Sequence, residues 1–130
     1  MNEADTRARL VDPELKAAGW TDQQVTREFY YQRDVRYTPG KIILVGDQVR
    51  HGKGRKVDYL LRLTDGFPLA VVEAEPDYKS PGSRLEQAKG YACDLGIAFA
   101  YSTNGHGIVE FDSFTHAVRK IDRFSAPQEL

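Results

Sequence analysis

Apolar residues in the middle of the chain form two strand-like runs with a turn between them. Val57–Leu63 and Pro68–Glu73 are rich in branched and aromatic residues, which favours β-strands. Asp65 and Gly66 separate the two runs, and Asp-Gly is typical of a two-residue hairpin turn because both residues tolerate positive φ. The pattern therefore predicts a β-hairpin with Asp65 and Gly66 at its tip.

The rest of the chain predicts helices and strands on both sides of this hairpin. The expected helices are residues 3–10, a short helix capped by Asp12 that stops at Gly19, and a helix from Ser80 or Ser83 to Gly96. The expected strands are Val25–Tyr31, Lys41–Val45, Ile97–Ser102 and Gly107–Phe111, and residues 46–56 are expected to form a glycine-rich loop. This order of elements indicates an α/β fold with a mixed sheet.

Length and composition limit the class of protein. A chain of 130 residues suffices for one compact domain, expected to span residues 1–130, and its 41% hydrophobic and 28% charged residues are ordinary for a globular protein. The net charge of −1 gives no overall attraction to a polyanion, so a nucleic-acid site has to be local. No apolar run approaches the roughly 20 residues that span a bilayer, and the N-terminus lacks a signal-peptide pattern. These features predict a cytoplasmic protein without a membrane partner.

Three acidic side chains gather at the open end of the predicted hairpin. With the turn at Asp65 and Gly66, Asp58 lies directly opposite Glu73, with roughly 5 Å between their Cβ atoms. Glu75 emerges on the same face because side chains alternate along a strand. The next pair along the strands is apolar, so the acids are expected where the buried face meets the end of the sheet.

Opposed carboxylates destabilise a sheet unless a cation compensates them. Mg²⁺, with Mn²⁺ as an alternative, prefers carboxylate oxygens and can exchange a bound water for a phosphodiester oxygen. Such an ion would polarise the phosphoryl group and supply the attacking hydroxide, which indicates nuclease chemistry.

Two other interpretations stay open at this point. The acids are equally explained as surface groups paired with Lys56, Arg55 or Arg62, and Lys56 would then lie opposite Glu75. A longer turn would also shift the register by one residue and separate the acids.

Four blocks of the sequence together resemble the nuclease domain of type I restriction enzyme R subunits, over most of the chain. The blocks are Val57–Leu60, Val71–Glu75, Gln87–Ala92 and Phe99–Gly105. That family belongs to the PD-(D/E)XK nuclease superfamily. The resemblance implies a restriction-endonuclease-like α/β/α sandwich with a central mixed β-sheet and a Mg²⁺-dependent endodeoxyribonuclease. It also implies that Asp58 is a metal ligand on one strand and that Glu73 begins an E-x-K triplet on the next.

The chain departs from the family pattern at the third position of this triplet. Glu75 stands where the superfamily usually has a lysine, and a carboxylate cannot copy the charge of an ammonium group. Lys79 lies four residues further on and is the candidate side chain that swings back and activates the attacking water. Glu75 then assists, or acts as a third metal ligand beside Asp58 and Glu73.

Two residue pairs at helical spacing also match the family. Gln87 and Tyr91 match its Q-x-x-x-Y element and are expected to contact DNA or to support the catalytic residues. Glu3 and Arg7 resemble a helical acid and a nearby base that some members use beside the metal. A simple surface ion pair is the alternative for Glu3 and Arg7.

Basic residues before Asp58 provide a candidate DNA contact. Lys53, Arg55 and Lys56 are interleaved with glycines, so this stretch could grip phosphates, although any exposed loop has such a composition.

The resemblance also concerns partners. The R subunits continue into ATP-driven helicase domains, and this chain has no P-loop, so it is expected to be a fragment of a longer protein. ATP use and assembly with methylation and specificity subunits would belong to that parent protein, and a transient dimer would allow double-strand cleavage. Two further functions stay open: a catalytically inactive DNA-binding or assembly module of the same fold, and a stand-alone nuclease in repair or phage defence.

Overall fold

The computed structural model describes residues 1–32, 36–38, 41–45, 54–64 and 66–130. Its helical elements are α1 (Glu3–Thr6), a π-helical turn (Arg7–Val11), α2 (Asp12–Ala17), α3 (Leu85–Leu95) and a 3₁₀ turn (Pro127–Glu129). Its strands are β1 (Val25–Gln32), β2 (Arg36–Thr38), β3 (Lys41–Val45), β4 (Gly54–Thr64), β5 (Phe67–Ala74), β6 (Phe99–Thr103), β7 (Ile108–Asp112) and β8 (Ala117–Ile121).

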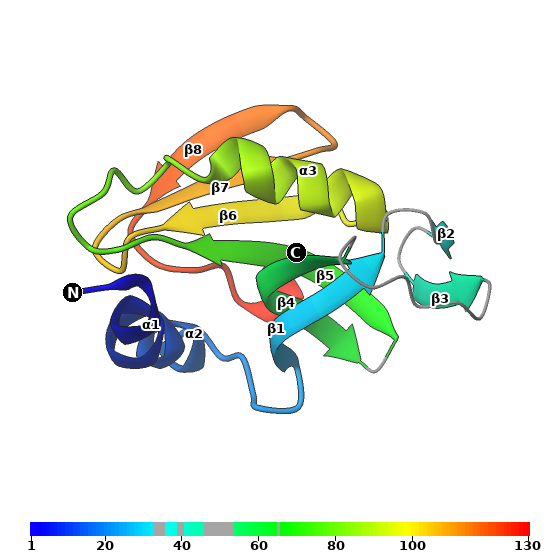
Figure 1. Cartoon of the computed structure of the whole chain (residues 1–130), viewed down its shortest axis with the longest axis horizontal. Coiled ribbons are helices and arrows are strands. Elements are labelled where there is room, and N and C mark those ends of the chain that lie inside the picture. Colours follow the sequence, from blue (N-terminus) through cyan, green and yellow to red (C-terminus); the bar gives the residue numbers. More distant parts are fainter. Residues whose placement is uncertain (33–35, 39–40, 46–53, 65) are drawn as a thin grey trace.

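A six-stranded mixed sheet forms the centre of the molecule (Figure 1). Its strand order is β1-β4-β5-β6-β7-β8, and β2 pairs with β3 in a separate two-stranded sheet. The chain passes from β5 through α3 to β6, and these two strands are parallel, whereas the other neighbours in the large sheet are antiparallel. The mixed sheet predicted from the sequence is therefore confirmed.

Apolar cores lie on both faces of this sheet. The N-terminal helical segment packs on one face, where Leu15 and Trp20 are buried against residues of the central strands. Helix α3 packs on the other face through Ala88, Ala92 and Leu95, and Figure 1 shows the two helical layers on opposite sides of the strands. This arrangement confirms the predicted α/β/α sandwich.

The predicted hairpin register is correct at the end that carries the carboxylates. Tyr59 pairs with Val72 and Leu60 with Val71, as expected from a turn at Asp65 and Gly66. The ladder shifts near Arg62, where Pro68 on the partner strand has no N–H to donate. Gly66 has a φ of 77°, which suits a hairpin turn, and Asp65 lies outside the described residues.

The prediction that Asp12 caps a second helix is wrong. Asp12 has helical backbone angles, and a π-helical turn connects it to α1 without a break. Its carboxylate instead accepts hydrogen bonds from the Tyr59 hydroxyl at 2.6 Å and from Arg27 Nε at 3.3 Å. A tertiary contact with the sheet has therefore replaced the local capping role.

Two further boundaries differ from the sequence prediction. Helix α3 begins at Leu85 rather than at Ser80 or Ser83, because the preceding residues form turns in which Ser83 N–H binds the Ser80 carbonyl. Strand β4 begins at Gly54, so the end of the predicted loop is part of the sheet, whereas residues 46–53 lie outside the described residues.

The sequence reasoning also missed strands β2 and β8. Strand β8 lies at the sheet edge and is mostly exposed, so it lacks the apolar alternation that marks a half-buried strand.

Among the described helices, none is long and apolar enough to cross a membrane.

A buried carboxylate on β7, two strands away from β5 in the sheet, has a structural role. Glu110 accepts hydrogen bonds from the Tyr101 hydroxyl at 2.6 Å, from Ser125 Oγ at 3.0 Å and from Arg119. Burial raises the pKa of Glu110, but the hydrogen bonds from Arg119, Tyr101 and Ser125 outweigh burial and leave it below its usual range. Glu110 is thus a fully bonded, ionised group of the core.

Candidate active site

Asp58 and Glu73 bind each other's strands at the end of the β4–β5 hairpin. The Asp58 N–H donates to Glu73 Oε2 at 2.8 Å, and the Ala74 N–H donates to Asp58 Oδ2 at 2.9 Å. These side-chain bonds begin where the described backbone ladder ends, at the pair Tyr59 and Val72. Both carboxylates are buried. The structure therefore brings the two predicted acids together at this end of the hairpin, and each carboxylate accepts a hydrogen bond from a backbone N–H of the neighbouring strand.

Glu75 follows β5 directly and is buried beside the same hairpin end. Its N–H donates to the Thr103 carbonyl at 2.8 Å, which fixes its backbone against β6. Its Oε1 lies 2.7 Å from Arg84 Nε, so the pairing of Glu75 with Lys56 that the sequence allowed is not the one observed. The guanidinium of Arg84 also lies 2.8 Å from Glu3 Oε2.

The N-terminal helix contributes an acid and a base to this site. Arg7 Nη1 lies 3.1 Å from both Glu3 Oε1 and Asp58 Oδ1. The pair of Glu3 and Arg7 is therefore more than a surface ion pair, because it is joined to a buried carboxylate of the sheet. Lys56, on β4, approaches the same oxygen, Asp58 Oδ1, at 3.9 Å.

Hydrogen bonds from the end of β6 position the segment that carries Arg84. Ser102 Oγ donates to the Pro81 carbonyl at 2.6 Å and accepts from the Arg84 N–H at 3.2 Å. Asn104 Nδ2 donates to the Lys79 carbonyl at 2.8 Å. The polar side chains of Ser102, in β6, and Asn104, just after it, thus hold the connection between β5 and α3 against the sheet.

Burial changes the protonation of the central pair. Burial, together with the neighbouring Asp58 carboxylate, raises the pKa of Glu73 to about 8, although the hydrogen bond from the Asp58 N–H opposes this rise. Burial also raises the pKa of Asp58, against the effect of the Ala74 N–H and of Arg7 and Lys56. The pair therefore resists carrying two negative charges unless a further cation is present.

The other predicted residues, Lys79, Gln87 and Tyr91, have contacts of their own. The Lys79 ammonium group is exposed and lies 6.0 Å from the centre of the Tyr78 ring. Gln87 Nε2 donates to the Tyr91 hydroxyl at 2.5 Å, and the Tyr91 ring packs edge-on against Tyr31. In the described part of the chain, the bases that form ion pairs with Asp58 and Glu75 are Arg7, Lys56 and Arg84, and Lys79 is not among them.

Of the three basic residues predicted to contact DNA, two lie in the sheet and one lies outside the described residues. Arg55 and Lys56 are on β4, paired with Tyr31 and Tyr30 of β1, and Arg55 is exposed. Lys53 lies outside the described residues. Of the two described members, Lys56 is the one whose ion pair with Asp58 the structure gives.

The donor chemistry of the site fits a hard divalent cation. Asp58, Glu73 and Glu75 offer carboxylate oxygens, the ligands that Mg²⁺ prefers. Glu75 Oε1 is buried and, within the described residues, accepts no hydrogen bond of normal geometry, in spite of its short distance to Arg84. Among the described residues of the chain, no three His, Cys, Asp or Glu side chains lie close enough together to form a preformed metal site. Asp58, Glu73 and Glu75 are the residues that would hold such an ion.

Comparison with known proteins supports the resemblance expected from the sequence. The chain is 29% identical over 136 residues, and over its whole length, to the type I restriction enzyme EcoAI endonuclease subunit of Escherichia coli. It also matches, over its whole length, the fragment structure described as an HsdR subunit of a type I restriction enzyme from Vibrio vulnificus YJ016, with 42% identity and a TM-score of 0.81. The chain is similar to HsdR subunits throughout.

The chain spans only a small part of the length of these relatives. It covers 16% of the Escherichia coli subunit and 24% of the Vibrio vulnificus chain. No protein-family model matches the sequence. The similarity confirms the predicted resemblance and the fold class, because the Vibrio vulnificus structure combines 42% sequence identity with a TM-score of 0.81 over the whole of this chain.

Two residues of the candidate site were missed by the sequence reasoning. Arg84 and Glu28 are charged residues in unremarkable sequence surroundings, and only their contacts reveal them: Arg84 binds Glu3 and Glu75, and Glu28 approaches Arg7. For Glu28, a strand pattern gives no signal, because an exposed acid at a polar position is what an ordinary surface strand contains.

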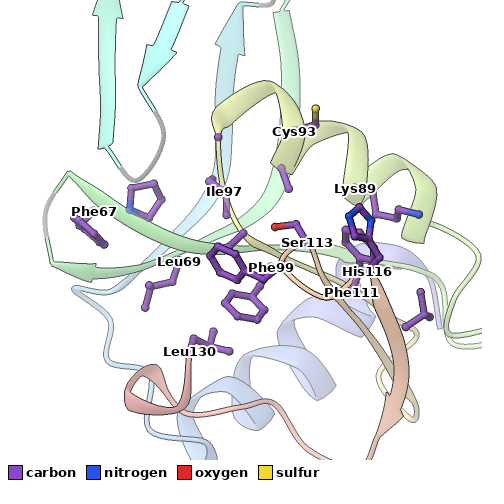
Figure 2. A pocket seen from close by; sticks show the side chains of 16 residues that line it. Phe67, Leu69, Lys89, Cys93, Ile97, Phe99, Phe111, Ser113, His116 and Leu130 are labelled. Carbon is purple, nitrogen blue, oxygen red and sulfur yellow. The ribbon is translucent and has the colours of Figure 1, made fainter.

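A large apolar groove among the described residues is separate from this site. Its volume is about 920 Å³, and its lining includes Phe67, Phe99 and the C-terminal Leu130. Figure 2 shows these side chains below α3, with Lys89 and His116 toward one end. The site carboxylates do not line the groove, so its residues offer no comparable set of metal ligands.

Proposed function

We propose that the chain is the metal-dependent endodeoxyribonuclease domain of a type I restriction enzyme R subunit and hydrolyses DNA phosphodiester bonds. One observation carries the proposal: Asp58 and Glu73 are buried face to face, hydrogen-bonded to each other's strands, with Glu75 directly beyond them. Burying several acids together is costly, and such a site is maintained where a cation uses it. The similarity to subunits of type I restriction enzymes agrees with this chemistry.

In this proposal, each side chain has a defined task. Asp58, Glu73 and Glu75 would hold Mg²⁺ or Mn²⁺, which polarises a phosphodiester and lowers the pKa of a bound water. The hydrogen bonds of Asp58 and Glu73 keep their carboxylates in place, so little reorganisation is needed. Lys79 is the proposed base that takes the proton of the attacking water, and its backbone is held by Asn104.

DNA would be bound by side chains around the carboxylates. Lys56 is at the site, Arg55 is exposed nearby on the same strand, and Lys53 precedes them in the sequence. Gln87 and Tyr91 on α3 are proposed to support the site or a DNA strand, and Glu3 to act as the helical acid beside it. These basic groups would position the phosphates and carry no sequence preference of their own.

Calorimetry with MnCl₂ and nicking of supercoiled plasmid test the proposal together. Asp58→Asn should lose both metal binding and nicking. Lys79→Met should bind metal but nick DNA on the order of a hundredfold more slowly, as expected when a general base is removed. Lys120→Met, on the exposed edge strand, is the matched control. A wild-type protein that binds no metal would contradict the proposal.

A catalytically inactive DNA-binding or assembly module is the second candidate. The observation that favours it is Glu75, which occupies the position of the usual lysine and is neutralised by Arg84. This candidate predicts that the wild type binds DNA but leaves plasmid intact with Mg²⁺ and with Mn²⁺. The plasmid assay therefore distinguishes the two.

The parent protein and its partners belong to the same proposal. Because the relatives are much longer than this chain, we place residues 1–130 as one domain of a cytoplasmic protein with ATP-driven helicase domains. That protein would assemble with methylation and specificity subunits, and a transient dimer would cut both DNA strands. The gene sequence around the coding region tests this placement against a stand-alone nuclease in repair or phage defence.

A further inference from the structure

Glu28 has an unusual backbone for a residue in the middle of a strand. Its φ is 55°, in the left-handed region that side chains with a Cβ rarely adopt. The other non-glycine residue with positive φ among the described ones is His116, which lies in the turn before β8. A strained backbone inside a strand persists only where the surrounding structure holds it, and such positions often lie at functional sites.

The strained residue lies at the level of Asp58 in the sheet. Arg27 pairs with Tyr59 and Phe29 with Val57, so Glu28 and Asp58 are the residues between these two pairs. Glu28 therefore approaches Asp58 from β1, on the opposite side from β5 and Glu73.

Both strands change the face that they bury at this level. On β1, Val25 packs in the core of the N-terminal helices, whereas Tyr31 packs beneath α3. On β4, Tyr59 belongs to the first of these cores and Val57 to the second. In a regular strand, residues an even number of positions apart share a face. Val25 and Tyr31 are six positions apart but lie on opposite faces, so β1 reverses its faces between them. Glu28, with its left-handed backbone, lies in this stretch.

The Glu28 carboxylate binds two bases that also bind Asp58. Its Oε1 lies 3.7 Å from Arg7 Nη2 and 3.7 Å from Lys56 Nζ. Arg7 and Lys56 approach Asp58 Oδ1 at 3.1 and 3.9 Å. The side chains of Glu28 and Lys56 are 50% and 37% exposed, whereas that of Asp58 is 2% exposed. Glu28 and the two bases thus form an outer rim above a buried carboxylate.

We propose that Glu28 is a positioning residue that holds Arg7 and Lys56 at the rim of the carboxylate site, where both can receive the phosphate group of DNA. This inference rests on the proposed nuclease function. Without Glu28, Lys56 would be left with Asp58, and Arg7 with Asp58 and Glu3. Positive charge drawn closer to Asp58 opposes the binding of a metal ion there. The strained backbone is retained because it directs the carboxylate toward these bases rather than along the regular strand.

Three variants separate positioning from structural support. Glu28→Gln keeps the size and removes the charge, Glu28→Asp keeps the charge, and Glu28→Asn removes the charge while tolerating left-handed φ. Glu86→Gln, an exposed acid on α3, is the control. The measurements are urea unfolding, Mn²⁺ affinity by calorimetry, and the single-turnover rate of plasmid nicking at saturating protein.

The proposal predicts opposite effects on stability and activity. Glu28→Asn should unfold at a higher urea concentration than the wild type, because strain is relieved. Glu28→Gln and Glu28→Asn should bind Mn²⁺ several-fold more weakly and nick about tenfold more slowly, a loss typical of misplaced positioning groups. Glu28→Asp should keep more of the Mn²⁺ affinity and of the nicking rate than Glu28→Gln does. The rate losses of Glu28→Gln and Lys56→Gln should not multiply in the double variant, because one residue acts through the other.

The outcomes also separate this inference from the proposed function. If the wild type binds Mn²⁺ and nicks DNA but Glu28→Gln equals it in both, the positioning role is wrong and the nuclease stands. If the wild type neither binds Mn²⁺ nor nicks DNA, the proposed function fails and the positioning role fails with it.

Discussion

Replacing Glu73 with glutamine should flatten the dependence of stability on pH in the absence of metal. The pKa of Glu73 is about 8 in the folded protein, against an ordinary value of 4.5. A carboxyl group with a raised pKa holds its proton more tightly in the folded state. Its contribution to stability is therefore complete below the ordinary pKa and is lost as the pH rises through the folded value. The metal-free wild type should become less stable across this window.

The magnitude follows from the size of the pKa shift. Between about pH 5.5 and about pH 8.5, the shift lowers the free energy of unfolding by about 3 kcal/mol. Glu73 is fully buried, so solvent screening does not reduce this effect. Glutamine retains an oxygen that can accept the hydrogen bond from the Asp58 N–H, so the variant should fold and lose most of the pH dependence.

Urea unfolding followed by fluorescence measures this directly, because the chain has a single tryptophan, Trp20, and it is buried. Glu86→Gln is the control for the loss of an exposed carboxylate. Stability curves of the wild type and Glu73→Gln that stay parallel over the whole pH range would refute the reasoning, since the charge of Glu73 would then not be the cause.

Added metal extends the same experiment. Metal ligands bind in the deprotonated form, so Mg²⁺ should stabilise the wild type most at alkaline pH. At ten times the dissociation constant, the gain would be about 1.4 kcal/mol. If Mg²⁺ stabilised Glu73→Gln as much as the wild type, Glu73 would not be a metal ligand.

Four further variants change residues outside the carboxylate pair. Gly105→Ala should lower the free energy of unfolding by about 3 kcal/mol, because φ is 88° and the new Cβ would lie 2.5 Å from Leu10 Cδ1. Gly66→Ala, with φ of 77° and open space around it, should cost only about 1 kcal/mol in the same urea titration. Glu110→Gln should cost about 2 kcal/mol near neutral pH. Because the pKa of Glu110 is lowered in the folded state, its contribution is present above the ordinary value, and the difference from the wild type should shrink as the pH falls. Ser102→Ala should cost about 1 to 2 kcal/mol and speed hydrogen exchange at the Arg84 N–H, which loses its acceptor; unchanged exchange would show that the anchor lies elsewhere.

Local patterns determined the hairpin and the facing acids from the sequence alone. The Asp-Gly pair in the sequence predicts the register in which Tyr59 pairs with Val72, and this register brings Asp58 close to Glu73 at the next position along the strands. The helix end at Gly96 was equally predictable, since this glycine adopts a φ of 70° that other residues disfavour. These features depend on neighbours within a few positions of each other.

Contacts between distant segments were decided only by the tertiary structure. Asp12 has the sequence of a helix cap but binds Tyr59 and Arg27 instead. Arg84 and Glu28 reach the site from segments that no local pattern relates to Asp58 or Glu75. The physical reason is that long charged side chains choose partners by the packing of strands and helices around them, and sequence spacing does not encode that packing.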